Sequence, residues 1–198
     1  MSTVEIIGKT RAYNGFFKLD KYLLRHSLFS GGSSETLERE LFERGHAVAV
    51  LPYDPVADCV LLVEQFRIGA LQAKGGPWLL EIVAGMIEAG ETPAEVARRE
   101  ALEEAACELA ELVPVHHYFS SPGGSSEQVS VFCARARLEG LDGGIHGNPE
   151  EGEDIRVQVV SFERAAELLE TGIINSAAPI IALQWLTLNR DRLRDRWS

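Results

Sequence analysis

The sequence has 198 residues, enough for one substantial domain and a smaller appendage. Hydrophobic residues make up 45% and charged residues 25%, a balance typical of a globular chain that buries a core. The net charge of −11, from 19 basic and 30 acidic residues, argues against a nucleic-acid binder or a protein of anionic membrane surfaces. An anionic substrate would need local help from arginines and a metal ion.

The three cysteines, Cys59, Cys107 and Cys133, stand in apolar or helical contexts and lack the spacing of metal ligands. An odd, scattered set predicts buried free thiols in a reducing compartment. The N-terminus lacks a basic region followed by an apolar core, and no run of about 18 apolar residues occurs. We therefore expect a cytoplasmic protein with no membrane partner.

Residues 1–45 predict a small unit of short strands. Val4 to Ile7 and Phe16 to His26 favour two strands, with a turn at Tyr13 to Gly15 between them. Residues 35–44 follow a second turn and are compatible with either a strand or a helix. Three such strands form too small a sheet to be stable alone. This N-terminal sheet must therefore pack against the main domain or against a second copy of the chain.

Residues 46–198 predict the main domain, an α/β arrangement in which a mixed sheet is flanked by helices. Strands are expected at residues 46–52, 59–67, 78–84, 113–119, 129–134 and 155–162, and the later helices at 164–171 and 176–193. The charged tail from Arg190 to Arg196 is expected to be solvated. Two loops stand out, a flexible one at 120–127 that ends in Glu127 and an acidic, glycine-rich one at 143–154.

The stretch from Gly85 to Cys107 carries the strongest signals in the chain. Glycines give its first part backbone freedom, and Thr92, Pro93 and Glu95 form the pattern of a capped helix start. No glycine or proline follows until Pro114, so the helix can extend to about Cys107.

Acidic residues gather on one side of that helix. At about 100° per residue, Glu100, Glu103 and Glu104 share a side with apolar positions, which should point inward or into a cleft. Like charges four residues apart weaken a helix unless a cation lies between them, and Mg²⁺ or Mn²⁺ prefers such oxygen ligands. Arg99, one turn before Glu103, can pair with it. Helix composition alone would instead favour an ordinary solvated face.

The full pattern decides against the solvated face. Gly85 is followed after five residues by Glu91, and after seven more by Arg99-Glu100-Ala101-Leu102-Glu103-Glu104. This pattern resembles the signature of the Nudix hydrolase family, which cleaves nucleoside diphosphates linked to another group. The one departure is Ala106, where the family has glycine; alanine favours helix, so a different exit from the helix is expected.

Further motifs extend the resemblance over nearly the whole chain and point to the ADP-ribose subgroup of the family. They include Gly15-Phe16-Phe17, Glu64-Gln65-Phe66-Arg67, Trp78-Leu79-Leu80-Glu81, Ser121-Pro122-Gly123-Gly124 and Glu153-Asp154-Ile155. The resemblance implies the Nudix fold, a mixed sheet between helices, and hydrolysis of ADP-ribose to AMP and ribose 5-phosphate. It also implies a homodimer that exchanges the N-terminal sheet.

The resemblance further implies roles for particular residues. Magnesium would be bound by Glu100, Glu104 and the carbonyl of Ala84, joined by Glu153 when substrate is present. Glu151 would be the catalytic base, with Glu150 and Glu153 close enough to compete for that role. The expected substrate contacts are Phe16, Phe17, Arg39, Glu40, Arg44, Arg67, Met86, Gly123 and Glu127.

Residue patterns alone leave some of these roles open. Phe16 and Phe17, beside a turn, favour core positions over an aromatic platform for a base. Arg67 at a strand end suits a bidentate phosphate contact as well as a solvated end. Two alternative functions also stay open: hydrolysis of another nucleoside diphosphate sugar such as GDP-mannose, and a non-catalytic module that binds ADP-ribose.

Overall fold

The computed structural model describes residues 3–197, apart from the side chain of Glu151. Two compact units divide the chain. Of the described residues, the smaller unit contains 3–46 and 119–128, and the larger unit contains 47–118 and 129–197. The loop predicted at 120–127 as part of the main domain therefore belongs with the small sheet.

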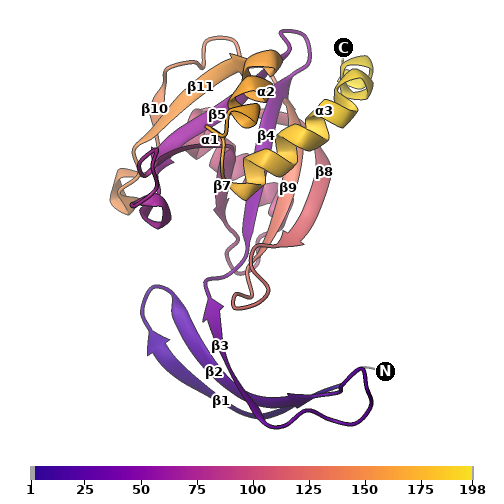
Figure 1. The fold of residues 1–198 in the computed structure, drawn as a ribbon. Coiled ribbons are helices and arrows are strands. Elements are labelled where there is room, and N and C mark those ends of the chain that lie inside the picture. Colours follow the sequence, from indigo (N-terminus) through magenta and orange to yellow (C-terminus); the bar gives the residue numbers. More distant parts are fainter. Residues whose placement is uncertain (1–2, 198) are drawn as a thin grey trace. The chain divides into compact units, whose positions relative to one another are not determined.

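The small unit is built on a three-stranded antiparallel sheet in the order β1, β2, β3 (Figure 1). Its strands are β1 (Val4–Asn14), β2 (Lys18–His26) and β3 (Leu37–Glu43). The first strand is longer than predicted, because it pairs with β2 beyond Ile7 through two register shifts. Residues 35–44, for which strand and helix were open, contribute strand β3.

This small sheet lacks an apolar interior of its own. Asp20 is the single fully buried residue of its three strands, while Val4, Ile6 and Tyr13 are each more than 60% exposed. A sheet with so little buried apolar area gains little of the hydrophobic stabilisation that folding requires.

The large unit contains a mixed eight-stranded sheet. Its main path runs β10, β11, β5, β4, β9, β8, with β6 added beside β5 and β7 beside β4. The β4 and β9 pair is parallel, whereas β4 and β5 are antiparallel. The strands are β4 (Ala47–Asp54), β5 (Cys59–Phe66), β6 (Trp78–Glu81), β7 (Val83–Met86), β8 (Leu109–Phe119), β9 (Gln128–Ala136), β10 (Ile145–His146) and β11 (Ile155–Ser161).

Helices cover both faces of this sheet (Figure 1). Helix α1 (Pro93–Ala105) packs on one face, and α2 (Phe162–Glu170) and α3 (Ala177–Trp197) pack on the other. Alternation along β5 serves both layers: Leu61 and Val63 join the α1 cluster, and Val60 and Leu62 join the other. The predicted mixed sheet between helices, with a small antiparallel sheet, is confirmed. Short 3-10 turns occur at Ile68–Ala70 and Pro149–Glu151.

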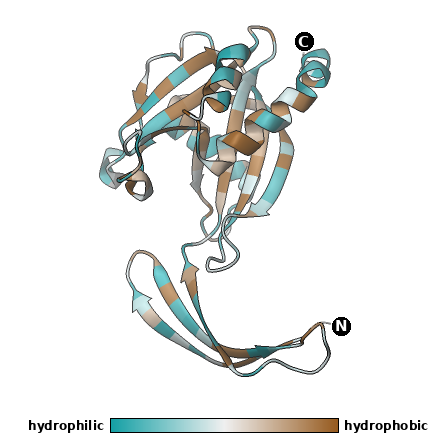
Figure 2. Cartoon of the chain, in the orientation of Figure 1, coloured by the Kyte–Doolittle hydropathy of each residue, from teal (hydrophilic) through white to brown (hydrophobic). Residues whose placement is uncertain are grey.

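The end of α3 differs from the prediction of a solvated tail. Leu193 and Trp197 are buried, although hydrophilic residues predominate toward this end of the helix in Figure 2. Arg190 donates to both carboxylate oxygens of Asp58, and Arg194 Nη1 lies 3.0 Å from Asp58 Oδ2. These ion pairs fix the helix end to the turn between β4 and β5. The sequence pattern does not predict this contact, because its partners are far apart in the chain.

All three cysteines are free thiols. Cys107 and Cys133 are buried as predicted, whereas Cys59 is only partly buried. Burial raises the pKa of the Cys107 thiol to about 11, so it stays protonated near neutral pH.

Candidate active site

Strand β7 leads into helix α1 through the glycine loop predicted from the sequence. The helix starts with a complete capping box: Thr92 Oγ1 accepts from the Glu95 amide, and Glu95 Oε2 accepts from the Thr92 amide at 2.8 Å. Pro93 occupies the first helical position, where its missing N–H is not needed. Such a cap stabilises a helix by about 1 kcal/mol, and it fixes where the carboxylates of α1 begin to turn toward the sheet.

The helix ends at Ala105, two residues earlier than predicted. Ala106 adopts a left-handed conformation, φ 49° and ψ 31°, and its amide and that of Cys107 bond back to Leu102 and Ala101. This is the helix ending that glycine accommodates most easily. Alanine therefore closes the helix in the conformation typical of glycine, at a cost in backbone strain.

Arg99 connects the acidic residues of the loop and helix. Its Nε lies 3.1 Å from Glu91 Oε1, and its Nη1 donates to Glu100 Oε1 at 2.9 Å and to Glu103 Oε2 at 3.1 Å. Its Nη2 lies 3.5 Å from the carbonyl oxygen of Met86. The predicted pairing of Arg99 with Glu103 is confirmed, and the same guanidinium also orients Glu100.

Gly85 allows the Glu100 side chain to lie directly against strand β7. A Cβ atom on Gly85 would lie 1.8 Å from Glu100 Oε1 and 2.1 Å from its Cδ. No side chain fits there while Glu100 keeps its position. The spacing between the glycine and the helix carboxylate thus has a direct steric cause.

Glu104 lies deepest in the acidic group, with 2% of its surface exposed. Its Oε2 accepts from the Ala84 amide at 3.1 Å. Burial raises the pKa of Glu104 to about 8 and that of Glu100 to about 7. The charge of Glu153 raises the pKa of both, and that of Arg67 opposes the shift at Glu104, so these four residues share one electrostatic environment. Glu103, in contrast, is half exposed.

The donor set fits a hard divalent cation. Glu100 and Glu104 lie on one helix face, and the charge of Glu153 contributes to the electrostatic potential around them. Carboxylates are ligands of the type that magnesium and manganese prefer. Within residues 3–197, the side chain of Glu151 excepted, no three acidic, histidine or cysteine side chains form a ready-made metal cluster. Magnesium commonly takes one or two carboxylates and completes its shell with water and substrate phosphates, so the open arrangement suits it.

Arg67 follows strand β5 in the same unit. Its Nε donates to Glu81 Oε2 at 2.7 Å, and its backbone amide donates to the Pro77 carbonyl at 2.7 Å. Sequence reasoning included Glu81 only as part of a family motif and assigned it no role. Glu153, the predicted fourth magnesium ligand, accepts from the Asn148 amide at 3.0 Å. The side chain of Glu151, the predicted base, lies outside the described residues.

The small unit holds the remaining predicted substrate contacts. Phe16 is 90% exposed, which contradicts the core position that its sequence context favoured. Its ring packs edge-on against Phe17, and the Arg44 guanidinium lies 5.4 Å from the Phe17 ring centroid. Arg44 Nε lies 3.1 Å from an oxygen of the nearly buried Glu127. The other three predicted contacts in this unit, Arg39, Glu40 and Gly123, are exposed.

A pocket of about 360 Å³ in the small unit includes Phe16 and Arg44 among its lining residues. Beside them stands Asp20, whose buried carboxylate binds Lys9 and Arg11. Sequence analysis missed this ion-pair cluster. The signal was present in principle, since Asp20 stands at an inward position of an alternating strand, but its partners lie on another strand.

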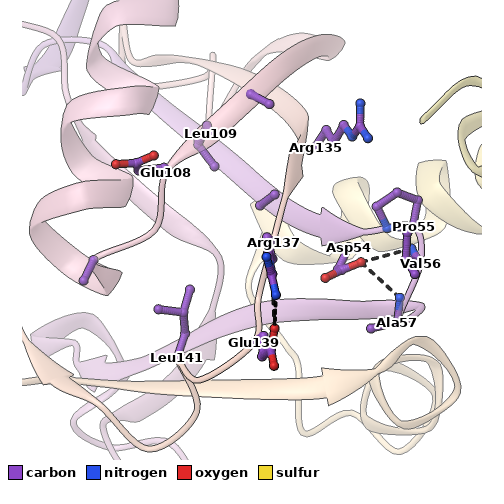
Figure 3. A pocket seen from close by; sticks show the side chains of 13 residues that line it. Asp54, Pro55, Val56, Ala57, Glu108, Leu109, Arg135, Arg137, Glu139 and Leu141 are labelled. Carbon is purple, nitrogen blue, oxygen red and sulfur yellow. Dashed lines mark hydrogen bonds and ion pairs between the residues drawn. The ribbon is translucent and has the colours of Figure 1, made fainter. Parts of the chain in front are cut away.

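A larger cavity, of about 920 Å³, lies in the large unit near the end of α1 and the turn after β4 (Figure 3). Three of its charged groups have partners: Asp54 accepts from the amides of Val56 and Ala57, and Arg137 pairs with Glu139. None of the predicted catalytic or metal-binding residues lines this cavity. The buried carboxylates of α1, rather than the size of a hollow, therefore locate the candidate site.

The geometry defines an α/β protein in which a glycine loop presents a helix with buried carboxylates. A family model described as NUDIX domain matches residues 34–184. The chain belongs to the NUDIX domain family. A solved structure described as "Crystal structure of ADP compounds hydrolase" shares the fold, with a TM-score of 0.69 and 21% identity, over 98% of this chain and 96% of that one.

Curated relatives are similar over almost the full length. An ADP-ribose pyrophosphatase of Escherichia coli (strain K12) is 50% identical over 195 residues, covering 98% of this chain and 93% of the relative. The Haemophilus influenzae protein of the same name is 43% identical, over 98% of this chain and 91% of the relative. A GDP-mannose pyrophosphatase of Enterobacter sp. (strain 638) is 33% identical, over 77% of this chain and 78% of the relative. In the part of the chain that the structure describes, no helix is long and apolar enough to cross a membrane.

Proposed function

We propose that the protein hydrolyses the diphosphate of ADP-ribose, with magnesium, to AMP and ribose 5-phosphate. The observation that carries this proposal is a pair of carboxylates on the helix of the family signature, the buried Glu104 and Glu100, whose side chain is 13% exposed. The substrate follows from the relatives at 50% and 43% identity, both named ADP-ribose pyrophosphatase. Retention of every charged position of the signature favours an enzyme over a module that only binds.

Glu100, Glu104 and the carbonyl of Ala84 would hold the cation, with Glu153 joining them beside substrate. When bound, magnesium neutralises phosphate oxygens and lowers the pKa of water. Support comes from the raised pKa values of Glu100 and Glu104, because two buried carboxylates ionise readily only when a cation compensates their charge. Manganese is a reasonable substitute, since it accepts the same oxygen ligands.

The chain's own groups have three tasks in this reaction. Glu151 would accept a proton from the attacking water, with Glu150 and Glu153 as the alternatives for that base. Arg67 would contact the diphosphate through its guanidinium, and Met86 would lie near it. Glu127 would contact the terminal ribose, with Gly123 nearby.

The small unit would bind the adenosine end. Phe16 and Phe17 would flank the adenine, and Arg39, Glu40 and Arg44 would help to enclose it. The exposure of Phe16 and its contact with Phe17 support an aromatic platform. We propose a homodimer in which the small sheets are exchanged, so that several of these groups come from the second subunit. The lack of an apolar interior in β1 to β3 supports this dimer, and the free cysteines support a cytoplasmic location.

The test is hydrolysis of ADP-ribose by the purified full chain with magnesium, beside GDP-mannose, NADH and diadenosine polyphosphates. Strong preference for ADP-ribose with AMP and ribose 5-phosphate as products is expected. GDP-mannose is the second candidate because a relative of that activity is 33% identical. Preference for GDP-mannose would reject the proposed substrate but keep the reaction class. Tight binding of ADP-ribose without turnover would reject the enzyme assignment.

A further inference from the structure

The backbone of Arg67 is held by a hydrogen bond, whereas its long side chain has many rotamers. Its amide bonds to Pro77 across the β5 and β6 hairpin, and the neighbouring rings of Phe66 and Trp78 pack with centroids 5.7 Å apart. The side chain itself is 40% exposed. A free arginine side chain loses rotamer entropy when it binds an anion, and that loss weakens the binding. Some group has to hold it in place.

Glu81 is that group in the structure. Its carboxylate, 15% exposed, receives the Arg67 Nε proton at 2.7 Å. Nε carries a single proton, so the four protons on Nη1 and Nη2 stay available for a second anion. Among the described residues, Arg67 makes no other side-chain hydrogen bond. A guanidinium held at one edge and open at the other is suited to bidentate contact with phosphate.

Both residues belong to the face of the sheet that α1 covers. On β6, Leu80 packs toward the opposite face in the cluster of α2 and α3, so Glu81 alternates to the α1 face. On β5, Val63 packs with α1. Arg67 stands four residues later, so the same alternation assigns it to the α1 face. Gln65, which stands between Val63 and Arg67 in the chain, is 5% exposed, and its Nε2 has no hydrogen-bond partner among the residues that the structure describes. This side of the hairpin therefore offers hydrogen-bond donors that the protein does not satisfy internally.

We infer that Glu81 is a positioning residue, which holds Arg67 through Nε and directs the free edge of its guanidinium at the substrate diphosphate. The inference rests on the proposed function for the identity of the anion, and on the geometry for the role of Glu81. In this role Glu81 acts through Arg67. Its effect should therefore vanish when Arg67 is absent.

The experiment is a double-mutant cycle of Glu81→Gln and Arg67→Ala in the full chain. Three quantities are measured: the dissociation constant of inorganic pyrophosphate, by calorimetry with magnesium, and KM and kcat for ADP-ribose. Glu64→Gln is the matched control, because Glu64 lies on β5, the strand paired with β6, and its carboxylate pairs with Arg156 instead of Arg67. Melting temperatures of all variants establish folding, and Arg67→Lys replaces Arg67→Ala if the latter does not fold.

Glu81→Gln should weaken pyrophosphate binding and raise KM about tenfold each, with a much smaller change in kcat, and Glu64→Gln should change neither. In the Arg67→Ala background, Glu81→Gln should add nothing. An equal loss in both backgrounds, no loss in either, or no pyrophosphate binding by the unaltered chain would overturn the inference. Failure of the proposed function is a separate result: ADP-ribose is not hydrolysed, yet the pyrophosphate cycle still decides the role of Glu81.

Discussion

The contact between Gly85 and Glu100 gives a prediction of defined size. In Gly85→Ala the new methyl group would lie 1.8 Å from Glu100 Oε1, so the carboxylate has to move by more than 1 Å to reach any tolerable separation. Misplacement of a reacting or ligand group by about 1 Å costs about 100-fold in rate. The backbone of Gly85 does not have a positive φ, so alanine fits it without strain. We therefore expect about a 100-fold loss of ADP-ribose turnover with an almost unchanged melting temperature.

The assay is steady-state hydrolysis over a magnesium titration, together with thermal unfolding. Gly75→Ala is the control, because a Cβ at Gly75 meets nothing within 4 Å and its φ is not positive. A displaced ligand should also raise the magnesium concentration needed for half-maximal rate. Wild-type turnover in a folded Gly85→Ala protein would refute the claim that this close approach positions Glu100.

Three further predictions concern stability. Ala106→Gly should raise the free energy of unfolding by about 1 kcal/mol, seen as a melting temperature about 2–4 °C higher, because glycine relieves the left-handed strain; a lower melting temperature would contradict this. Without divalent cations, Glu100 and Glu104 keep protons in the folded chain that the unfolded chain loses above about pH 4.5. The free energy of unfolding should therefore fall as pH rises from about 4.5 to about 8, and magnesium should stabilise more at the alkaline end; denaturant titrations showing a flat profile would reject this. Asp58→Asn keeps a residue that tolerates positive φ but weakens the pairing with Arg190. It should lower the free energy of unfolding by about 1–2 kcal/mol, measured by chemical denaturation. An unchanged denaturation midpoint would show that the ion pair contributes nothing to stability.

The part of the site on α1 could be predicted because its determinants are local. Thr92 and Glu95 fix the start of the helix, and helical periodicity then brings Glu100 and Glu104 to one side. The burial of Glu104 followed from the apolar residues that share that side. Within a single helix, the spacing of residues in the sequence determines which side chains share a face.

The contacts that sequence reasoning missed join residues distant in the chain. The pairs of Asp58 with Arg190 and of Arg67 with Glu81 depend on how elements pack, which no local pattern contains. The length of β1 was missed for a related reason. Its second half is polar and exposed on most positions, so pairing with β2, rather than alternation, extends it.

The measurement that tests the central claim most directly is magnesium-dependent hydrolysis of ADP-ribose by the unaltered chain, Glu100→Gln and Glu108→Gln. Glu100 is a largely buried carboxylate of the α1 site, whereas Glu108 is exposed just beyond the same helix. We predict that Glu100→Gln remains folded and loses most activity, while Glu108→Gln retains it. Undiminished turnover by Glu100→Gln would contradict the assignment of the metal site to this helix.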